Sequence, residues 1–157
     1  MCIRDRSRAT VFSLPSGIAV NDDYVFVRNT GSSIEKFTRS NLNQAGYQNF
    51  GSGEVYWPFG MSMNNAGNKL ILANWHGRRF TEFNVAGSTL NFSRSLYRGR
   101  QGFDADYDSN GNIFGAEAHR LRKYNSSLTY QNQIASNYNM PLGAYYNWMQ
   151  FDFDKLD

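Results

Sequence analysis

The first chemistry that the residues suggest is calcium binding. Residues 106–117 read DYDSNGNIFGAE, which satisfies the calcium-loop pattern D-x-[DN]-x-[DN]-G-x₅-E at every specified position. Asp106, Asp108 and Asn110 would supply oxygen ligands, Gly111 the sharp turn, and Glu117 a bidentate carboxylate. A calcium EF-hand needs a helix on each side, however, and the flanks RGRQGFDA and AHRLRKYN are interrupted by Gly or patterned as strands. The sequence therefore favours a hairpin turn in which Asn110-Gly111 supplies the positive φ angles.

Three carboxylates crowd this expected turn and the strand before it, namely Asp104, Asp106 and Asp108. Hard oxygen ligands at such a place would hold a cation loosely, and these residues are the metal candidates of the chain. The favoured alternative is that they are surface carboxylates on a solvated turn. The single cysteine, Cys2, leaves the chain without a disulfide framework or a thiolate metal site. We therefore expect no bound metal and no cofactor.

The two histidines, His76 and His119, each follow a short apolar run that ends in a polar residue, Asn74 or Glu117. Imidazole is a good ligand and a good general base near neutral pH, so neighbouring histidines would suit catalysis or metal binding. A zinc site needs at least three protein ligands, and the sequence has no third histidine. A structural role is the favoured alternative.

Trp75 stands beside Arg78 and Arg79. An aromatic ring next to guanidinium groups suits a carboxylate, sugar or peptide ligand. The alternative is a tryptophan that packs on the rim of the fold. No catalytic motif accompanies these residues, so catalytic residues stay unassigned. The ligand-binding candidates are Asn74, Trp75, His76, Arg78, Glu117 and His119.

These candidates belong to a repeated unit. Gly17, Gly60, Gly102 and Gly143 open four related segments at spacings of 43, 42 and 41 residues. After each of the first three come a polar turn, an apolar run, a segment with apolar ends, and a looser fourth segment. Four short strands in roughly 42 residues match the blade period of a β-propeller. No segment keeps a helical apolar stripe for three turns. We therefore predict an all-β chain of about three four-stranded antiparallel blades and the start of a fourth.

The predicted domain is a single incomplete β-propeller over residues 11–157, truncated at both ends. Its repeat units are expected near residues 15–57, 58–99, 100–140 and 141–157. Residues 1–10 are expected to be an artefactual or disordered leader, because MCIRDR looks like a translated sequencing adapter of the kind found in environmental, metagenomic assemblies.

The third unit resembles the NHL repeat. Its segments DSNGNIF and HRLRKY follow a consensus of the form D-x-x-G-N-I-Y-V-A-D…H-R-I-x-K-F, and the second unit, PFGMSMNNAGNKLILANW, looks closer to the related YVTN-type repeat. The resemblance covers about residues 15–125 and implies a propeller of six or seven blades. Arg28, Asn74 and Glu117 stand where the family has an aspartate after the second strand.

In a propeller, the loops from strand two to three and from strand four to the next blade surround the mouth of the central channel. We expect the candidate residues there, presented by a binding or scaffold propeller to a protein, peptide or carbohydrate ligand. Missing blades of the same chain would complete the ring. The alternative is a propeller enzyme, a lyase or lactone hydrolase with its site in the channel, and whether the protein is an enzyme stays open.

The charge pattern separates further classes of partner. The formal net charge is +3 and the basic residues are scattered with acids between them, which predicts a mixed solvated surface and no nucleic-acid partner. No apolar run approaches the roughly 20 residues of a membrane span. The low charge and the Cys-free repeats favour a secreted or periplasmic setting, and the localisation is otherwise open.

Overall fold

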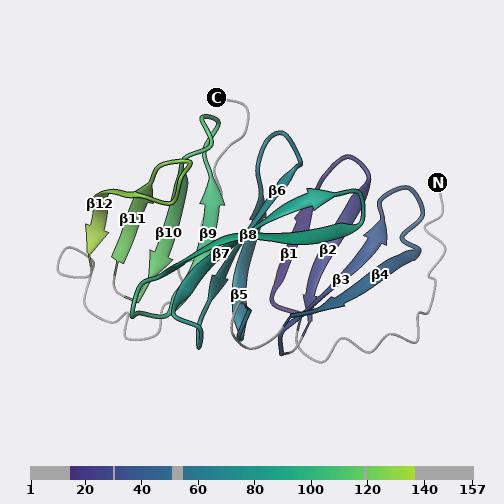
Figure 1. Cartoon of the computed structure of the whole chain (residues 1–157), viewed down its shortest axis with the longest axis horizontal. Helices are drawn as coiled ribbons and strands as arrows, with labels where there is room; N and C mark the ends of the chain where they lie inside the picture. The colour runs from purple at the N-terminus through teal and green to yellow at the C-terminus, as the bar shows by residue number, and fades with distance from the viewer. Residues whose placement is uncertain (1–14, 30, 51–54, 119, 137–157) are drawn as a thin grey trace.

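Every regular element of the chain is a β-strand in the part that the structure describes. The structure is a computed structural model, and it describes residues 15–29, 31–50, 55–118 and 120–136. The strands form three four-stranded sheets, each antiparallel and each in chain order (Figure 1). The predicted all-β fold of about three blades is confirmed. None of the described residues forms a helix long and apolar enough to cross a membrane.

The blades follow one another along the chain. The first contains β1 (Gly17–Val20), β2 (Tyr24–Asn29), β3 (Ser33–Thr38) and β4 (Gln44–Asn49). The second contains β5 (Pro58–Met63), β6 (Lys69–Asn74), β7 (Arg79–Ala86) and β8 (Thr89–Tyr97). The third contains β9 (Gly102–Tyr107), β10 (Ile113–Glu117), β11 (Arg120–Tyr124) and β12 (Tyr130–Ser136). The predicted strand starts near Gly17, Gly60 and Gly102 are confirmed, whereas Gly143, the unit at 141–157 and the leader at 1–10 lie outside the described residues.

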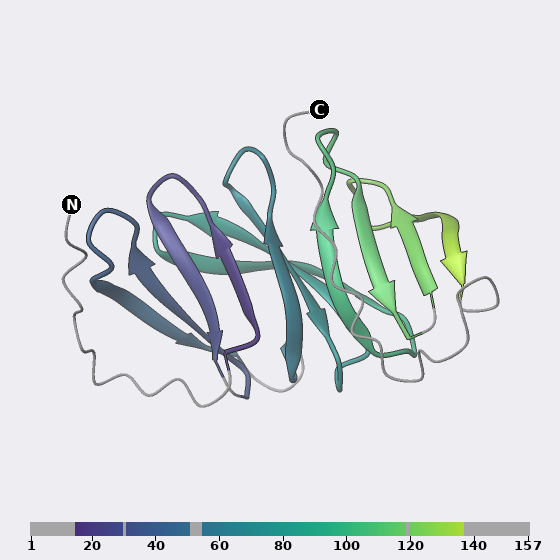
Figure 2. The same ribbon diagram turned by 180° about the vertical axis from the view of Figure 1, so that it is seen from behind.

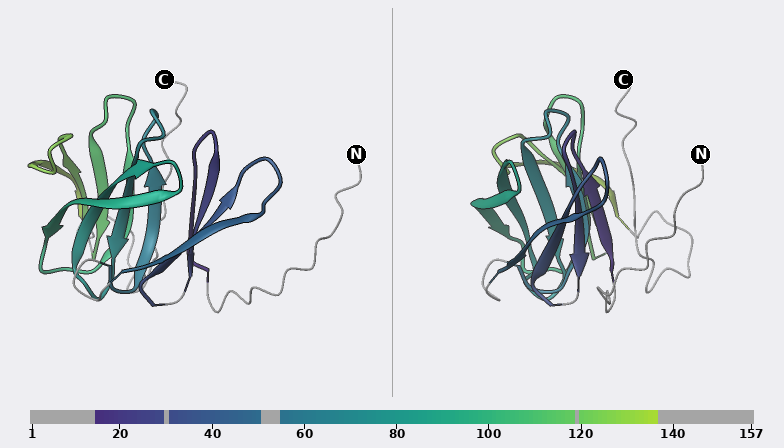
Figure 3. Two further views of the ribbon diagram at one scale, coloured as in Figure 1. Left: turned by 45° about the vertical axis from the view of Figure 1, so that its right-hand side comes forward. Right: turned by 90° about the vertical axis from the view of Figure 1, so that its right-hand side faces the viewer.

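The blades stand side by side and approach each other most closely at their first strands. β5 contacts both β1 and β9, so β1, β5 and β9 are the inner strands, and β4, β8 and β12 are the outer ones (Figures 1 and 2). Seen from the sides, the outer strands splay apart while the inner strands stay together (Figure 3). This is the arrangement of neighbouring blades around a propeller axis.

Two apolar cores fill the spaces between the blades, and β6 contributes to both. Leu70 and Leu72 join the core shared with the first blade, and Ile71 and Ala73 join the core shared with the third. All four side chains are fully buried. Alternate side chains of a strand point to opposite faces, so a continuous apolar run gives a sheet buried on both sides.

The turn after each inner strand begins with an asparagine or aspartate. Asn21, Asn64 and Asp108 stand at the same place, and each side-chain oxygen accepts backbone N–H bonds from the turn that follows. Gly67 and Gly111 occupy the left-handed region, with φ of 68° and 76°, which glycine adopts without a steric penalty. The polar turns of the repeat are therefore closed locally, by their own side chains.

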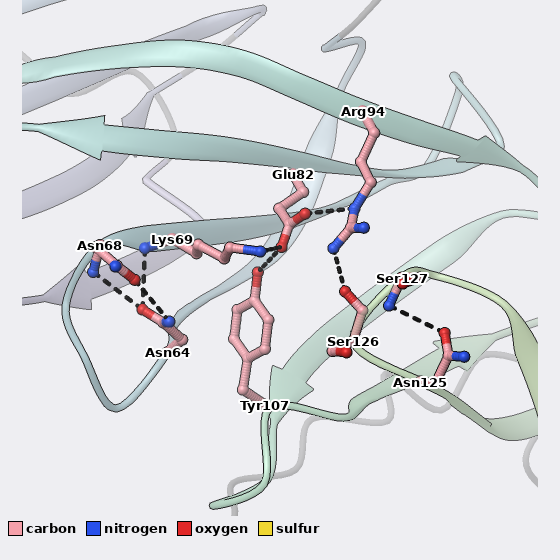
Figure 4. Close-up of polar contacts among 9 residues, drawn as sticks. All are labelled: Asn64, Asn68, Lys69, Glu82, Arg94, Tyr107, Asn125, Ser126 and Ser127. Carbon is pink, nitrogen blue, oxygen red and sulfur yellow. Dashed lines mark hydrogen bonds and ion pairs between the residues drawn. The ribbon is translucent and has the colours of Figure 1, made fainter.

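A buried carboxylate joins the second blade to the third (Figure 4). Glu82 of β7 is fully buried and lies 3.3 Å from Lys69 Nζ and 2.5 Å from Arg94 Nε. The Tyr107 hydroxyl of β9 donates a 3.0 Å hydrogen bond to Glu82 Oε1, and Arg94 donates to the backbone oxygen of Ser126. Burial, followed by the Glu82 carboxylate, raises the pKa of Tyr107.

Candidate functional site

Connections that lie far apart in the sequence meet at one end of the blades. In Figure 1 the connections β6–β7, β8–β9 and β10–β11 run along the lower edge. Backbone hydrogen bonds join neighbouring connections: Trp75 N donates to Trp57 O (3.0 Å), Arg98 N to Arg78 O (2.8 Å) and Ala118 N to Gln101 O (2.9 Å). This end, formed by residues 55–57, 75–79, 97–101, 117–118 and 120, is termed the loop face below.

Trp75 is held between phenylalanines of two inner strands. The centroid of its ring lies 5.3 Å from that of Phe59 on β5 and 4.6 Å from that of Phe103 on β9, both with edge-to-face geometry. Such pairs add to the stability gained from burial. Trp75 is half-buried and packs on the inner strands, and its role in binding a ligand stays a prediction.

His76 lies beside an aromatic pair that the sequence analysis did not single out. Its ring centroid is 5.3 Å from that of Tyr56 and 5.2 Å from that of Trp57. His76 is exposed, and Tyr56 and Trp57 are 41% and 44% exposed. Both aromatics belong to the connection from strand four to the next blade, which also reaches the mouth of a propeller. The Trp57-Pro58 pair before the recurrent glycine was the signal that could have found them.

The backbone is strained at two exposed residues of the loop face. Trp57 and Arg78 have φ of 50° and 49°, and they are two of the four non-glycine residues with positive φ in the described part of the chain. The left-handed conformation costs a non-glycine residue about 1–2 kcal/mol. Strain of this kind persists where surrounding contacts impose it, and it gathers at binding sites.

Asn74 positions the exposed aromatic pair from beneath. Its side chain is fully buried, its Nδ2 donates to Thr81 Oγ1 (3.0 Å), and its Oδ1 accepts from Tyr56 N (3.0 Å). The second bond fixes the backbone of Tyr56 against the end of β6. Asn74 is thus placed to hold the loop face, and its polar atoms are occupied by the protein itself.

Glu117 has the same place in the third blade and is also fully buried. Its carboxylate lies 3.3 Å from Arg98 Nε and 3.1 Å from Arg122 Nη1, and it accepts a hydrogen bond from the Tyr124 hydroxyl. Burial, followed by Glu117, raises the pKa of Tyr124. Arg98 belongs to the connection β8–β9, so Glu117 ties that connection to the third blade.

The last residue of the second strand forms a cross-strand polar pair in every described blade. Asn74 bonds Thr81, Glu117 pairs with Arg122, and in the first blade Asn29 Nδ2 donates to Glu35 Oε1 at 2.7 Å. The strand registers match Asn29, rather than Arg28, with Asn74 and Glu117. The sequence alignment of Arg28 with these residues was wrong by one position.

The calcium-loop motif is spread over both ends of a hairpin. Asp108 opens the turn, whereas Glu117 ends β10, roughly 13 Å along the strand from Ile113 at about 3.3 Å per residue. The predicted hairpin, with Asn110-Gly111 at the turn and Ile113 beginning the next strand, is confirmed. Only Gly111 of that pair has a positive φ, because Asp108 O accepts from Gly111 N in a wider turn.

Asp104 and Asp106 are buried, not solvated as the sequence analysis favoured. They are 6% and 3% exposed. Asp106 Oδ1 accepts from Tyr107 N and from the Ser62 hydroxyl of the second blade. These carboxylates face the neighbouring inner strand, because β9 packs closely on β5. Within the described ranges no group of three or more His, Cys, Asp or Glu residues is arranged to hold a metal ion.

Two of the predicted site residues remain, Arg78 and His119. The side chain of Arg78 is exposed on the loop face beside His76. His119 lies outside the described residues, so its proximity to His76 stays a prediction, as does the expectation of no metal and no cofactor.

Solved structures identify the architecture. No protein-family model and no curated protein matches the sequence. The β-propeller domain of Myceliophteria thermophila Cps50 (Swd1) matches with a TM-score of 0.64 and 10% identity, over 77% of this chain and 41% of that one. The RRP9 WD40 repeats match with a TM-score of 0.67 and 9% identity, over 78% and 39%. The chain folds as a partial β-propeller.

A third structure extends the likeness to a protein of another kind. Kuenenia stuttgartiensis hydrazine synthase matches with a TM-score of 0.67 and 13% identity, over 87% of this chain and 40% of that one. The chain thus spans about two fifths of each of these structures. At such identities the likeness shows the propeller fold alone, because propellers host unrelated functions.

Proposed function

We propose that this propeller is a binding or scaffold module that docks a protein, peptide or carbohydrate partner on its loop face. The observation that carries the proposal is the exposed cluster of Tyr56, Trp57 and His76, packed ring against ring at the end of the second blade. Large aromatic side chains are enriched at recognition surfaces, where they supply contact area at a low entropic cost.

The surrounding contacts hold this cluster in place before any partner arrives. Asn74 fixes the backbone of Tyr56, and Trp57 O accepts from Trp75 N. Trp75 is in turn wedged between two inner-strand phenylalanines. A preordered surface loses less conformational entropy when it binds, which raises affinity. The strained backbone of Trp57 supports the same interpretation.

The proposal includes the finer assignment to NHL-like repeats, which rests on the third-unit segments DSNGNIF and HRLRKY. Further blades of the same protein would continue the loop face around the channel. They would bring equivalent connections beside those of the described blades, because repeats contact their neighbours in the same way each time.

The proposal is tested with Trp57→Ala, matched to Tyr47→Ala on β4. Tyr47 is also an exposed aromatic, at 56%, but it lies on the outer strand of the first blade. The purified chain would be used to select from a random peptide library and to probe a glycan array. We expect enriched peptides or retained glycans whose binding is lost in Trp57→Ala and kept in Tyr47→Ala. Binding that both variants keep would overturn the proposal.

The enzyme alternative is separated by His76→Ala. In a binding module, His76→Ala would lower the affinity for the partner or leave it unchanged, and neither the variant nor the wild type would turn over a substrate. A propeller lyase or lactone hydrolase would lose turnover of a polysaccharide or lactone substrate while it still bound that substrate.

A further inference from the structure

Arginine side chains gather on the loop face. The five residues Arg78, Arg79, Arg98, Arg100 and Arg120 all lie in its connections or at the strand ends beside them. The sequence analysis predicted basic residues scattered among acids, and along the chain they are. In the fold they come together, because the connections β6–β7, β8–β9 and β10–β11 all end on the same side of antiparallel blades.

Among the described residues, the acids nearest to this face do not neutralise it at the surface. Glu117 is fully buried between Arg98 and Arg122. Asp104 is 6% exposed and faces the second blade. Exposed carboxylates are found instead at the turns of the opposite end, as in the ion pair of Asp22 with Arg39.

Four of the arginines have no acidic partner among the described residues. Within the described residues, the ion pairs join none of Arg78, Arg79, Arg100 and Arg120 to an acid. Arg78 and Arg100 are exposed, and Arg78 is the residue whose backbone is held at a positive φ. A cluster of guanidinium groups without acidic partners produces a positive potential that attracts anions.

Aromatic rings lie between these charges. The guanidinium carbon of Arg79 sits 5.9 Å from the centroid of the Tyr97 ring, and Tyr97 is 61% exposed. Trp57 and Tyr56 flank the other side of the β6–β7 connection. Trp, Tyr and Arg are the three residue types that dominate the binding energy of protein interfaces.

We infer that the loop face binds an acidic peptide segment of a partner protein, with carboxylates on the arginines and apolar side chains on Tyr56, Trp57 and Tyr97. Guanidinium groups bind carboxylates in a bidentate geometry, and complementary charge sets specificity and the rate of association. This inference rests on the proposed function and adds to it the charge class of the partner.

The mixture of arginine and aromatic side chains on the loop face favours a peptide over a nucleic acid as the partner. A nucleic-acid surface follows a phosphate backbone with a continuous row of cations and offers ring faces for bases to stack on. Here Trp75 is half-buried and enclosed by edge-to-face partners, and the formal charge of the whole chain is only +3. Carboxylates spaced by apolar side chains match alternating arginines and aromatics better.

The charge of selected peptides is the first test. Peptides enriched from a random library on the purified chain are expected to carry net negative charge together with aromatic or aliphatic residues. Neutral or basic peptides that require Trp57 would overturn the acidic-segment inference and leave the proposed function standing. Enrichment that Trp57→Ala does not reduce, or no enrichment at all, would overturn both.

Binding measurements on the most enriched acidic peptide are the second test. The double variant Arg78→Gln, Arg100→Gln should weaken binding about two- to thirtyfold, since it removes two exposed ion pairs with the peptide and each such pair contributes modestly. Replacing the peptide's Asp and Glu by Asn and Gln should have a similar effect, and both losses should shrink as salt is raised. Arg39→Gln is the matched control, because Arg39 lies at the opposite end and its loss should change nothing.

Two results would contradict the inference at this stage. One is an Arg39→Gln effect equal to that of the double variant, which would indicate attraction by overall charge alone. The other is tighter binding of a short oligothymidylate than of the acidic peptide, which would assign the loop face to single-stranded nucleic acid.

Discussion

The backbone of Gly60 lies directly against Asp104 of the neighbouring blade. A Cβ atom added to Gly60 would stand 1.9 Å from Asp104 Oδ1 and 2.6 Å from Asp104 Cα. No side-chain rotation relieves the second contact, because the Cα belongs to the backbone of β9. At Gly60 the recurrent glycine is therefore required by the close approach of two inner strands, not by a turn.

Gly60→Ala is expected to destabilise the chain by about 2–4 kcal/mol, since an inner strand must shift and open the core between the blades. Urea unfolding of the whole chain measures this loss. Gly46→Ala on β4 is the control: its added Cβ would meet only the end of the flexible Lys36 side chain, at 3.2 Å. Equal losses in the two variants would contradict the assignment of the cost to the Asp104 contact.

Glu82→Gln is expected to lower the free energy of unfolding by about 1–3 kcal/mol, because it leaves Lys69 and Arg94 without their shared carboxylate. The matched variant is Asp22→Asn, which removes a fully exposed partner of Arg39 and should cost less than about 0.5 kcal/mol. Thermal unfolding of both variants checks the contrast. A negligible effect at Glu82 would mean that this buried ion cluster does not help to join the blades.

Alkaline pH is expected to destabilise the fold through Tyr107. Its pKa is raised above the ordinary value of 10.0 in the folded chain, so above pH 10 the unfolded chain releases a proton that the folded chain retains. The contribution of Tyr107 to the free energy of unfolding is fully present below pH 10. Above pH 10 the free energy of unfolding falls, with a limiting slope of about 1.4 kcal/mol per pH unit for this residue. Tyr107→Phe should show a shallower decline than the wild type, and parallel declines would contradict the assignment.

Calcium is expected to bind no more tightly than about millimolar, the weak end of loop affinities, because Asp108 and Glu117 stand at opposite ends of β10. Isothermal titration measures this. Asp108→Ala should instead cost about 1 kcal/mol of stability, since it removes the acceptor of the Asn110 and Asn112 backbone amides. Asp108→Asn keeps an acceptor and should be nearly neutral. Micromolar binding abolished by Asp106→Ala or Glu117→Ala would refute the hairpin interpretation.

The blades could be predicted from the sequence because each strand is defined locally. Turn residues at Asn64 and Asp108 and apolar runs such as Leu70–Ala73 repeat at a nearly constant interval. These signals require only neighbouring residues, so the period gives the strands and their order. The contacts of a strand with the neighbouring blade do not follow from such local patterns. For this reason Asp104 and Asp106 were predicted to be solvated, although β5 covers them.

The site was only partly predictable for the same reason. Trp75 and His76 were found because they follow a recognisable apolar run. Tyr56 and Trp57 join the site through hydrogen bonds from the β6–β7 connection, across a distance in sequence that no local pattern records. The arginine cluster is likewise a product of topology, since its members come from three connections.

Four consecutive side chains of β6 alternate between the two faces of the middle blade, so its contacts with the blade before and the blade after can change independently. Leu70 and Leu72 serve one neighbour, while Ile71 and Ala73 serve the other. Mutation at an even-numbered position of this run therefore changes the packing against the first blade, and mutation at an odd-numbered position changes the packing against the third. On β6, a change in the neighbouring blade on one side therefore calls for compensating changes only at every second residue.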